Sequence, residues 1–163
     1  MRGTDGMHGA WRRCVITASV VALLLPGCST VSKIWNVSAQ TERVTLEATP
    51  MVNDGFPVAV DVVAVTESDF VKVLSDVEAK TWFQRRDEFL NNRGGVMDVR
   101  SFELVPGQRE TDIGYGYLDR RTYNGIFVFA QYVNGGNHRA RLDKFSEPLV
   151  LLGREGIRVE PES

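Results

Sequence analysis

The residue whose chemistry stands out in this sequence is Cys28, which follows an apolar run from Val15 to Leu25. Two arginines, Arg12 and Arg13, precede that run, and the small residue Gly27 stands directly before the cysteine. A positive flank, an apolar core of about 7 to 15 residues and a small residue before the cut are typical of a secretory signal. The run is too short to cross a bilayer, which takes about 20 apolar residues. We therefore expect a signal that is removed, with Cys28 beside the cut.

The segment Leu25-Pro26-Gly27-Cys28 resembles the lipobox of bacterial lipoproteins. That resemblance implies that the cysteine receives a diacylglycerol on its sulfur, becomes the new N-terminus and is then N-acylated. Two or more acyl chains hold a protein firmly on a membrane, because each buried CH₂ contributes about 0.8 kcal/mol. Ser29, with no aspartate after the cysteine, resembles the pattern sorted to the outer membrane. The alternative is an ordinary signal cut near Ala22 or Gly27, which leaves Cys28 as a free thiol.

Removal of residues 1–27 from the 163 leaves a mature chain of 136 residues, which suits one domain. We expect residues 28–41 to form the lipidated N-terminus and tether, and residues 42–163 to form a periplasmic domain. The signal takes three of 19 basic and one of 21 acidic residues, which leaves 16 basic and 20 acidic ones. This balance lacks the basic excess that nucleic-acid binding uses, so no nucleic-acid partner is expected.

The mature chain has few groups that could catalyse a reaction or bind a metal. Its one histidine, His138, stands beside a turn, so neither a histidine-rich metal site nor an imidazole relay is expected. The sequence contains no Gly-x-Ser-x-Gly nucleophile elbow and no glycine-rich phosphate loop. We therefore expect no enzyme, no metal and no cofactor other than the covalent lipid on Cys28. A hydrolase attached to the membrane surface is a third hypothesis.

Three further features each have a structural and a functional interpretation. Asp61, the one charge in an otherwise apolar strand, is either a functional acid or an aspartate that faces solvent or pairs with an arginine. Arg86 belongs to a solvated helix face, or forms a contact patch with Trp82 and Phe89. Five aromatic residues at strand spacing either fill the core or line a ligand groove: Tyr115, Tyr117, Tyr123, Phe127 and Phe129.

Hydrophobic periodicity predicts that strands carry most of these residues. Val44, Leu46 and Ala48 alternate with polar residues, as in a half-buried strand. Residues 57–66 are apolar on both faces apart from Asp61, which is typical of a strand covered on both sides. Between them, residues 49–56 supply turn chemistry through proline, Asn-Asp and glycine. Further strands are expected at residues 97–105, 109–118, 126–133, 139–142, 149–152 and 157–159.

Residues 67–92 have the only helical periodicity of any length, because Phe70, Val73 and Leu74 recur at intervals of three and four. The pattern indicates two short helices, or one helix broken near Ser75. About eight strands with this one helical insertion favour a mainly β fold, a two-layer antiparallel β-sandwich.

Three blocks follow one another along the chain. They are Asn53-Asp54-Gly55-Phe56-Pro57-Val58 before a valine-rich strand, Phe102-Glu103-Leu104-Val105-Pro106-Gly107, and the aromatic strand from Tyr123 to Tyr132. In this order, and together with the lipobox, they resemble the VasD/TssJ family, the outer-membrane lipoproteins of the type VI secretion system. The resemblance covers roughly residues 42–159 and implies a transthyretin-like sandwich facing the periplasm. It also implies a partner, the periplasmic domain of an inner-membrane TssM-type protein, held partly by the loop between the first two strands.

Carried onto this sequence, that loop comprises Thr49, Pro50, Met51, Val52, Asn53, Asp54, Gly55 and Phe56. We expect Met51, Val52 and Phe56 to supply apolar contacts, because exposed apolar residues in a turn-rich loop mark interfaces. Alternatively, Phe56 packs under its own loop. The resemblance thus implies an outer-membrane anchor that tethers a secretion complex through its partner. The runner-up hypothesis is an envelope lipoprotein that binds a small ligand or peptidoglycan in the aromatic groove.

Overall fold

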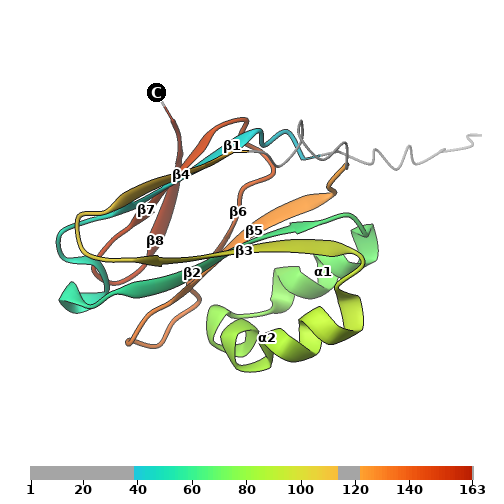
Figure 1. Ribbon diagram of the computed structural model, residues 1–163, viewed down its shortest axis with the longest axis horizontal. Helices are drawn as coiled ribbons and strands as arrows, with labels where there is room; N and C mark the ends of the chain where they lie inside the picture. Colours follow the sequence, from blue (N-terminus) through green and yellow to red (C-terminus); the bar gives the residue numbers. More distant parts are fainter. Residues whose placement is uncertain (1–38, 114–121, 163) are drawn as a thin grey trace, which may run out of the picture. The chain divides into compact units, whose positions relative to one another are not determined.

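The computed structural model describes residues 39–113 and 122–162, which form two β-sheets and a pair of helices (Figure 1). The strands are β1 (Arg43–Ala48), β2 (Val58–Val65), β3 (Met97–Leu104), β4 (Arg109–Ile113), β5 (Gly125–Gln131), β6 (Arg139–Arg141), β7 (Pro148–Leu152) and β8 (Ile157–Pro161). The helices are α1 (Ser68–Asp76) and α2 (Ala79–Arg93), and a 3-10 turn, η1, covers Val52–Gly55. Cys28, Tyr115 and Tyr117 lie outside the described residues.

The strands form two four-stranded sheets, in the orders β4-β1-β7-β8 and β3-β2-β5-β6. Every neighbouring pair is antiparallel except β1 and β7, which run parallel with Thr45 opposite Leu149. The predicted two-layer sandwich with one helical insertion is therefore confirmed, although one of its strand pairs is parallel.

The space between the two sheets is filled by aliphatic side chains. Val44, Leu46 and Ala48 of β1 all face this core, as their alternation predicts, and each is almost completely buried. They meet the inward face of the second sheet, which supplies Val58, Val60, Val62, Ala64, Ile126, Val128 and Ala130. Burial of one valine or leucine side chain contributes about 1.5–3 kcal/mol, so this layer supplies much of the stability.

Helices α1 and α2 cover the outer face of the sheet that contains β2 (Figure 1). Val63 and Val65 of β2 point to this face and pack with Phe127 and Phe129 of β5 against Leu74 and Trp82. Strand β2 is therefore covered on both sides, which explains why its sequence is apolar at nearly every position.

The helical insertion consists of two helices. Helix α1 ends at Asp76, and α2 begins at Ala79, because Val77 and Glu78 between them have extended backbone angles. Of the two expected arrangements, the one with two helices is correct, and the interruption lies at Val77 and Glu78 rather than at Ser75. Among the described residues, no helix combines the length and the apolar character needed to cross a membrane.

The described chain enters the domain at the end of β1 that lies away from residues 49–56 (Figure 1). The Ala39 N–H donates to the carbonyl of Tyr123 (2.7 Å), and the buried Thr41 hydroxyl donates to the carbonyl of Leu142 (2.9 Å). Residues 39–41, which the sequence placed in the tether, thus pack on the domain.

Candidate docking surface

Residues 49–56, called the β1–β2 loop below, connect β1 to β2 at one end of the sandwich. The strand registers bring three other turns to the same end, because Ala48 is opposite Leu152, Val58 is opposite Leu104 and Ala59 is opposite Gln131. These turns are residues 105–108 between β3 and β4, 132–138 between β5 and β6, and 153–156 between β7 and β8. The site expected from the sequence is therefore one of four neighbouring loops.

The backbone of the β1–β2 loop is held in an unusual conformation. Asn53, Asp54 and Gly55 have positive φ angles of 48°, 57° and 87°. Asn, Asp and Gly are the residues that adopt this left-handed region most readily, so the sequence fits the turn. The chain reverses within these three residues, and the Phe56 N–H donates to the carbonyl of Asn53 (3.2 Å).

The side chain of Asn53 fastens the loop to the rest of the domain. It is buried, and its Nδ2 donates to the carbonyl of Pro57 (2.9 Å). Its Oδ1 accepts a hydrogen bond from the backbone N–H of Val133 (2.8 Å), which belongs to the β5–β6 turn. One amide therefore joins the β1–β2 loop and the β5–β6 turn.

Asp54 makes a second set of links between the turns. The Arg154 Nε donates to its Oδ1 (2.7 Å), and the Asn134 Nδ2 donates to its Oδ2 (2.7 Å). The hydrogen bond from Arg154, followed by that from Asn134, lowers the pKa of the Asp54 carboxyl below its ordinary value of 3.8. The β1–β2 loop is thus tied through side chains to the turns that follow β5 and β7.

Tyr132 links the β5–β6 turn to the β7–β8 turn through its hydroxyl group. Its hydroxyl lies 3.1 Å from the carbonyl oxygen of Gly153 and 3.0 Å from that of Gly156. Burial of the ring raises the pKa of Tyr132 to about 12, and the phenol is a protonated hydrogen-bond donor at neutral pH. With Asn53 and Asp54, it makes this end of the sandwich a set of mutually fixed turns.

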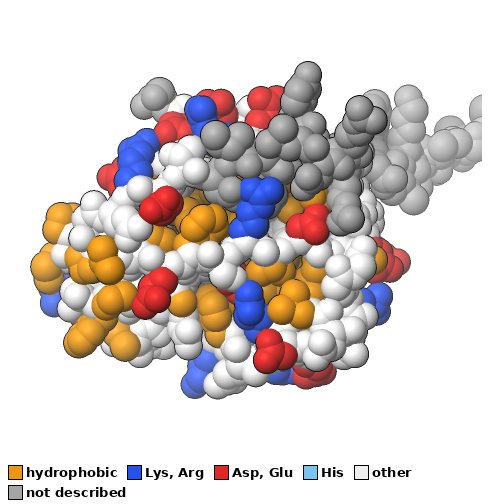
Figure 2. Space-filling view, in the orientation of Figure 1, with side chains coloured by type: hydrophobic (Ala, Val, Ile, Leu, Met, Phe, Trp, Pro, Cys, Tyr) orange, Lys and Arg blue, Asp and Glu red, His pale blue; other side chains and the backbone are white. Residues whose placement is uncertain are grey.

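Large apolar side chains project into solvent from these fixed turns. Met51 is 51% exposed and Phe56 is 59% exposed, while Val105 and Val133 in the adjacent turns are 50% and 66% exposed. Among the described residues only one other large apolar side chain, Val73 of α1, is comparably exposed. Figure 2 shows hydrophobic side chains gathered at the left end of the molecule, where these turns lie. We call Met51, Phe56, Val105 and Val133 the end patch.

Two expectations about the loop need correction. Val52, expected to supply an apolar contact, is fully buried and belongs to the core between the sheets, because the turn of η1 rotates it inward. Phe56 does not pack under its own loop, since more than half of its surface is exposed. Val105 and Val133 were not predicted as site residues, although each directly precedes a turn dipeptide, Pro-Gly and Asn-Gly respectively, which indicates an exposed apolar side chain.

The other candidate groups belong to the interior. Asp61 is buried and accepts hydrogen bonds from Trp82 Nε1 (2.8 Å), Arg86 Nε (2.7 Å) and Ser101 Oγ (2.6 Å). The pairing with an arginine is therefore the correct interpretation of Asp61, and Arg86 is not simply a solvated helix residue. Tyr123, Phe127 and Phe129 are buried core residues, so they line no ligand groove.

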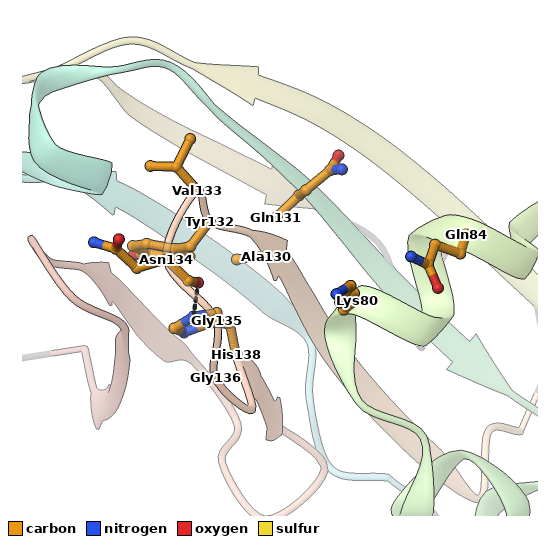
Figure 3. Close-up of a pocket in the computed structure, with 10 residues that line it drawn as sticks. All are labelled: Lys80, Gln84, Ala130, Gln131, Tyr132, Val133, Asn134, Gly135, Gly136 and His138. Carbon is orange, nitrogen blue, oxygen red and sulfur yellow. Dashed lines mark hydrogen bonds between the residues drawn. The ribbon is translucent and has the colours of Figure 1, made fainter.

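A shallow hollow lies beside the β5–β6 turn, between this turn and the first turns of α2 (Figure 3). Lys80 and Gln84 of α2 form one wall, and residues 130–136 with His138 form the other. His138 stacks on Tyr132, with ring centroids 4.3 Å apart, and its Nε2 lies 3.1 Å from the carbonyl oxygen of Asn134. Within residues 39–113 and 122–162, no cluster of His, Cys, Asp and Glu side chains could hold a metal ion.

No protein-family model and no curated protein matches the chain. Solved structures do match. TssJ1, a T6SS lipoprotein from Pseudomonas aeruginosa, aligns with a TM-score of 0.56 and 20% identity over 76% of this chain and 98% of that chain. Lip from Serratia marcescens, described as a membrane-bound component of the Type VI Secretion System, aligns with a TM-score of 0.52 and 19% identity over 76% of this chain and 99% of that chain. A structure of the T6SS protein TssM C-terminal domain from EAEC aligns with a TM-score of 0.53 and 12% identity over 74% of this chain and 98% of that chain. The chain therefore has the fold of TssJ-type lipoproteins, as the sequence resemblance predicted.

Proposed function

We propose that this protein is a TssJ-type lipoprotein of the outer membrane, which anchors a type VI secretion membrane complex. In this proposal, lipid on Cys28 holds the domain at the periplasmic face of the membrane. The β1–β2 loop then docks the periplasmic domain of an inner-membrane TssM-type protein. The fold shared with TssJ1 and Lip, together with the lipobox-like segment before Cys28, supports this assignment.

The observation that carries the docking role is the exposure of Met51 and Phe56 on a loop that is otherwise fixed. Large apolar side chains on a rigid support make good interface anchors, because little conformational entropy is lost when a partner covers them. Asn53 and Asp54 hold the loop through hydrogen bonds to the adjacent turns. The β1–β2 loop can therefore present Met51 and Phe56 in one arrangement before the partner arrives.

The two ends of β1 support a proposal in which one end of the domain lies at the membrane and the opposite end binds the partner. Ala39 enters the domain at one end of β1, and the β1–β2 loop leaves β1 at the other (Figure 1). The 11 residues that lead from Cys28 to Ala39 can span at most about 40 Å when fully extended. A lipid at Cys28 would thus hold the domain close to the membrane by one end and leave the opposite end for docking.

The mechanism is tethering rather than catalysis. Fixing the domain to a surface raises the effective concentration of its docking surface for a partner that reaches across the periplasm. A modest interface then suffices for stable assembly, which suits the limited area of a single loop and its neighbours.

Co-purification tests this function. The full chain is extracted with detergent from cells that assemble the secretion apparatus, and the eluate is probed for the TssM-type protein. We expect the two proteins to elute together. Elution of the lipoprotein without the TssM-type protein would contradict the docking role.

A further inference from the structure

The end patch does not stop at the β1–β2 loop, because a groove joins Phe56 to Val133. This loop groove is lined by residues of three neighbouring strands and their turns: Asn53, Phe56, Pro57, Ala59, Glu103, Gln131, Tyr132 and Val133. The Asn53 Oδ1 accepts a hydrogen bond from the Val133 N–H (2.8 Å), which links the two walls of the groove. A partner that covers Phe56 therefore meets the β5–β6 turn directly beside it.

On the far side of the same turn lies the hollow of Figure 3, which we call the hairpin groove. Gln131, Tyr132 and Val133 line both grooves, so the two run into each other around Val133. Val133 is the most exposed of the large apolar side chains described. Together the grooves form one path from the β1–β2 loop to helix α2.

The hairpin groove has a basic residue and no acidic one among its lining residues. None of its ten lining residues is acidic, and Lys80 and Gln84 stand along the wall formed by α2 (Figure 3). Among the described residues, Lys80 and Lys144 are the two basic side chains that make no hydrogen bond or ion pair. Glu103 is the acidic residue of the path, and it lines the loop groove, whereas Lys80 is a free cation in the hairpin groove, where it complements a carboxylate.

We propose that the docked partner continues from the β1–β2 loop over Val133 into the hairpin groove with an extended acidic segment. An apolar side chain of this segment covers Val133 beside Phe56, and a carboxylate farther along pairs with Lys80. This inference rests on the proposed function, because it assigns further contacts to the same partner. It adds helix α2 and the β5–β6 turn to the docking surface.

The test measures affinity of the detergent-purified full chain for the purified periplasmic domain of the TssM-type protein. Val133→Asp should weaken binding by about tenfold or more, because it places a charge in a desolvated apolar contact. Lys80→Glu should weaken it by about three- to tenfold, because it opposes a carboxylate with another. The milder variants Val133→Ser and Lys80→Gln should also weaken binding, and the change at Val133 should again have the larger effect.

Each variant has a matched control on this chain. Val73→Asp changes the one comparably exposed valine outside the end patch, and Lys144→Glu changes the other unpaired lysine. Both controls should bind like the wild type, and thermal unfolding of all variants should stay cooperative because the changed side chains are exposed.

The outcomes separate this inference from the proposed function. If Met51→Ser and Phe56→Ser weaken binding but the Val133 and Lys80 variants do not, the extended path is wrong and the β1–β2 loop alone docks the partner. Tighter binding by Lys80→Glu would overturn the acidic character of the segment. A wild-type chain that does not bind the periplasmic domain would overturn both proposals.

Discussion

The indole Nε1 of Trp82 donates a hydrogen bond of 2.8 Å to the carboxylate of Asp61, which joins helix α2 to the middle of strand β2. The same carboxylate accepts hydrogen bonds from Arg86, one turn farther along α2, and from Ser101 of β3. Trp82 also stacks on Phe129, with ring centroids 4.8 Å apart. A polar clamp thus fixes helix α2, and with it the wall of the hairpin groove, inside an otherwise apolar interface.

Arg86→Ala should destabilise the domain by about 2–4 kcal/mol, because it leaves the buried Asp61 carboxylate without its counter-charge. Arg85→Ala is the matched control, since Arg85 makes an ion pair of 2.6 Å with Glu88 on the exposed face of the same helix, compared with 2.7 Å for Arg86 and Asp61. Exposed pairs contribute about 0–1 kcal/mol. Urea unfolding followed by circular dichroism measures both variants. Equal losses of stability would show that the burial of Asp61 is unimportant.

Most of the fold could be predicted from hydrophobic periodicity. The alternation at Val44, Leu46 and Ala48 and the apolar run of β2 identify a strand with one buried face and a strand with two. The pattern indicates a break near Ser75 but not its exact position at Val77 and Glu78, because neither of these residues is a proline or glycine that would mark it. The parallel pairing of β1 with β7 depends on contacts between residues about 100 positions apart, which a local sequence pattern cannot predict.

The site was predictable in outline only. The turn chemistry of Asn53, Asp54 and Gly55 identifies the β1–β2 loop, but which side chains it exposes depends on the left-handed backbone of these residues. That backbone turns Val52 inward and Phe56 outward. Likewise, Asp61 could be assigned several partners by sequence, because a pairing with Arg86 across 25 positions is a tertiary contact.

Asn53→Ala should destabilise the domain by about 2–4 kcal/mol. The variant loses the hydrogen bond to the Pro57 carbonyl and the one from the Val133 N–H, and each loss costs about 1 kcal/mol. It also places alanine at a positive φ, which adds about 1 kcal/mol. Asn53→Gly removes the hydrogen bonds without the backbone cost, so it should be about 1 kcal/mol more stable than Asn53→Ala in urea unfolding. The reverse order would contradict the left-handed conformation.

The ion pair of Asp54 with Arg154 should make the loop sensitive to acid. Because the folded-state pKa of Asp54 lies below 3.8, the stabilisation is fully present above the unfolded-state pKa and is lost as the pH falls through the lower folded-state pKa. Titration of the Asp54 carboxyl carbon by NMR should give a midpoint below 3.8 in the wild type. Arg154→Gln should raise that midpoint toward the ordinary value. An unchanged midpoint would mean that Arg154 does not hold the carboxylate in solution.

Replacing Met51 and Phe56 by serine should abolish or strongly weaken partner binding while stability stays within about 0.5 kcal/mol of the wild type. Both side chains are exposed, so their removal costs the folded state little, whereas interface anchors of this kind carry most of a binding energy. Affinity for the purified TssM-type periplasmic domain and a thermal unfolding curve measure the two effects. Full affinity in the double variant would place the interface elsewhere on the domain.

Cys28→Ser should release the protein from the membrane without unfolding the domain. The substitution removes the sulfur that would carry the diacylglycerol, and the buried core residues of the described domain begin only at Val44. We expect the variant in the soluble periplasmic fraction, still able to bind the partner domain at the wild-type affinity. Fractionation with a high-salt wash, followed by the same binding assay, measures both properties. Membrane attachment that survives this wash would show that another part of the chain holds the protein there, and the lipid tether would be wrong.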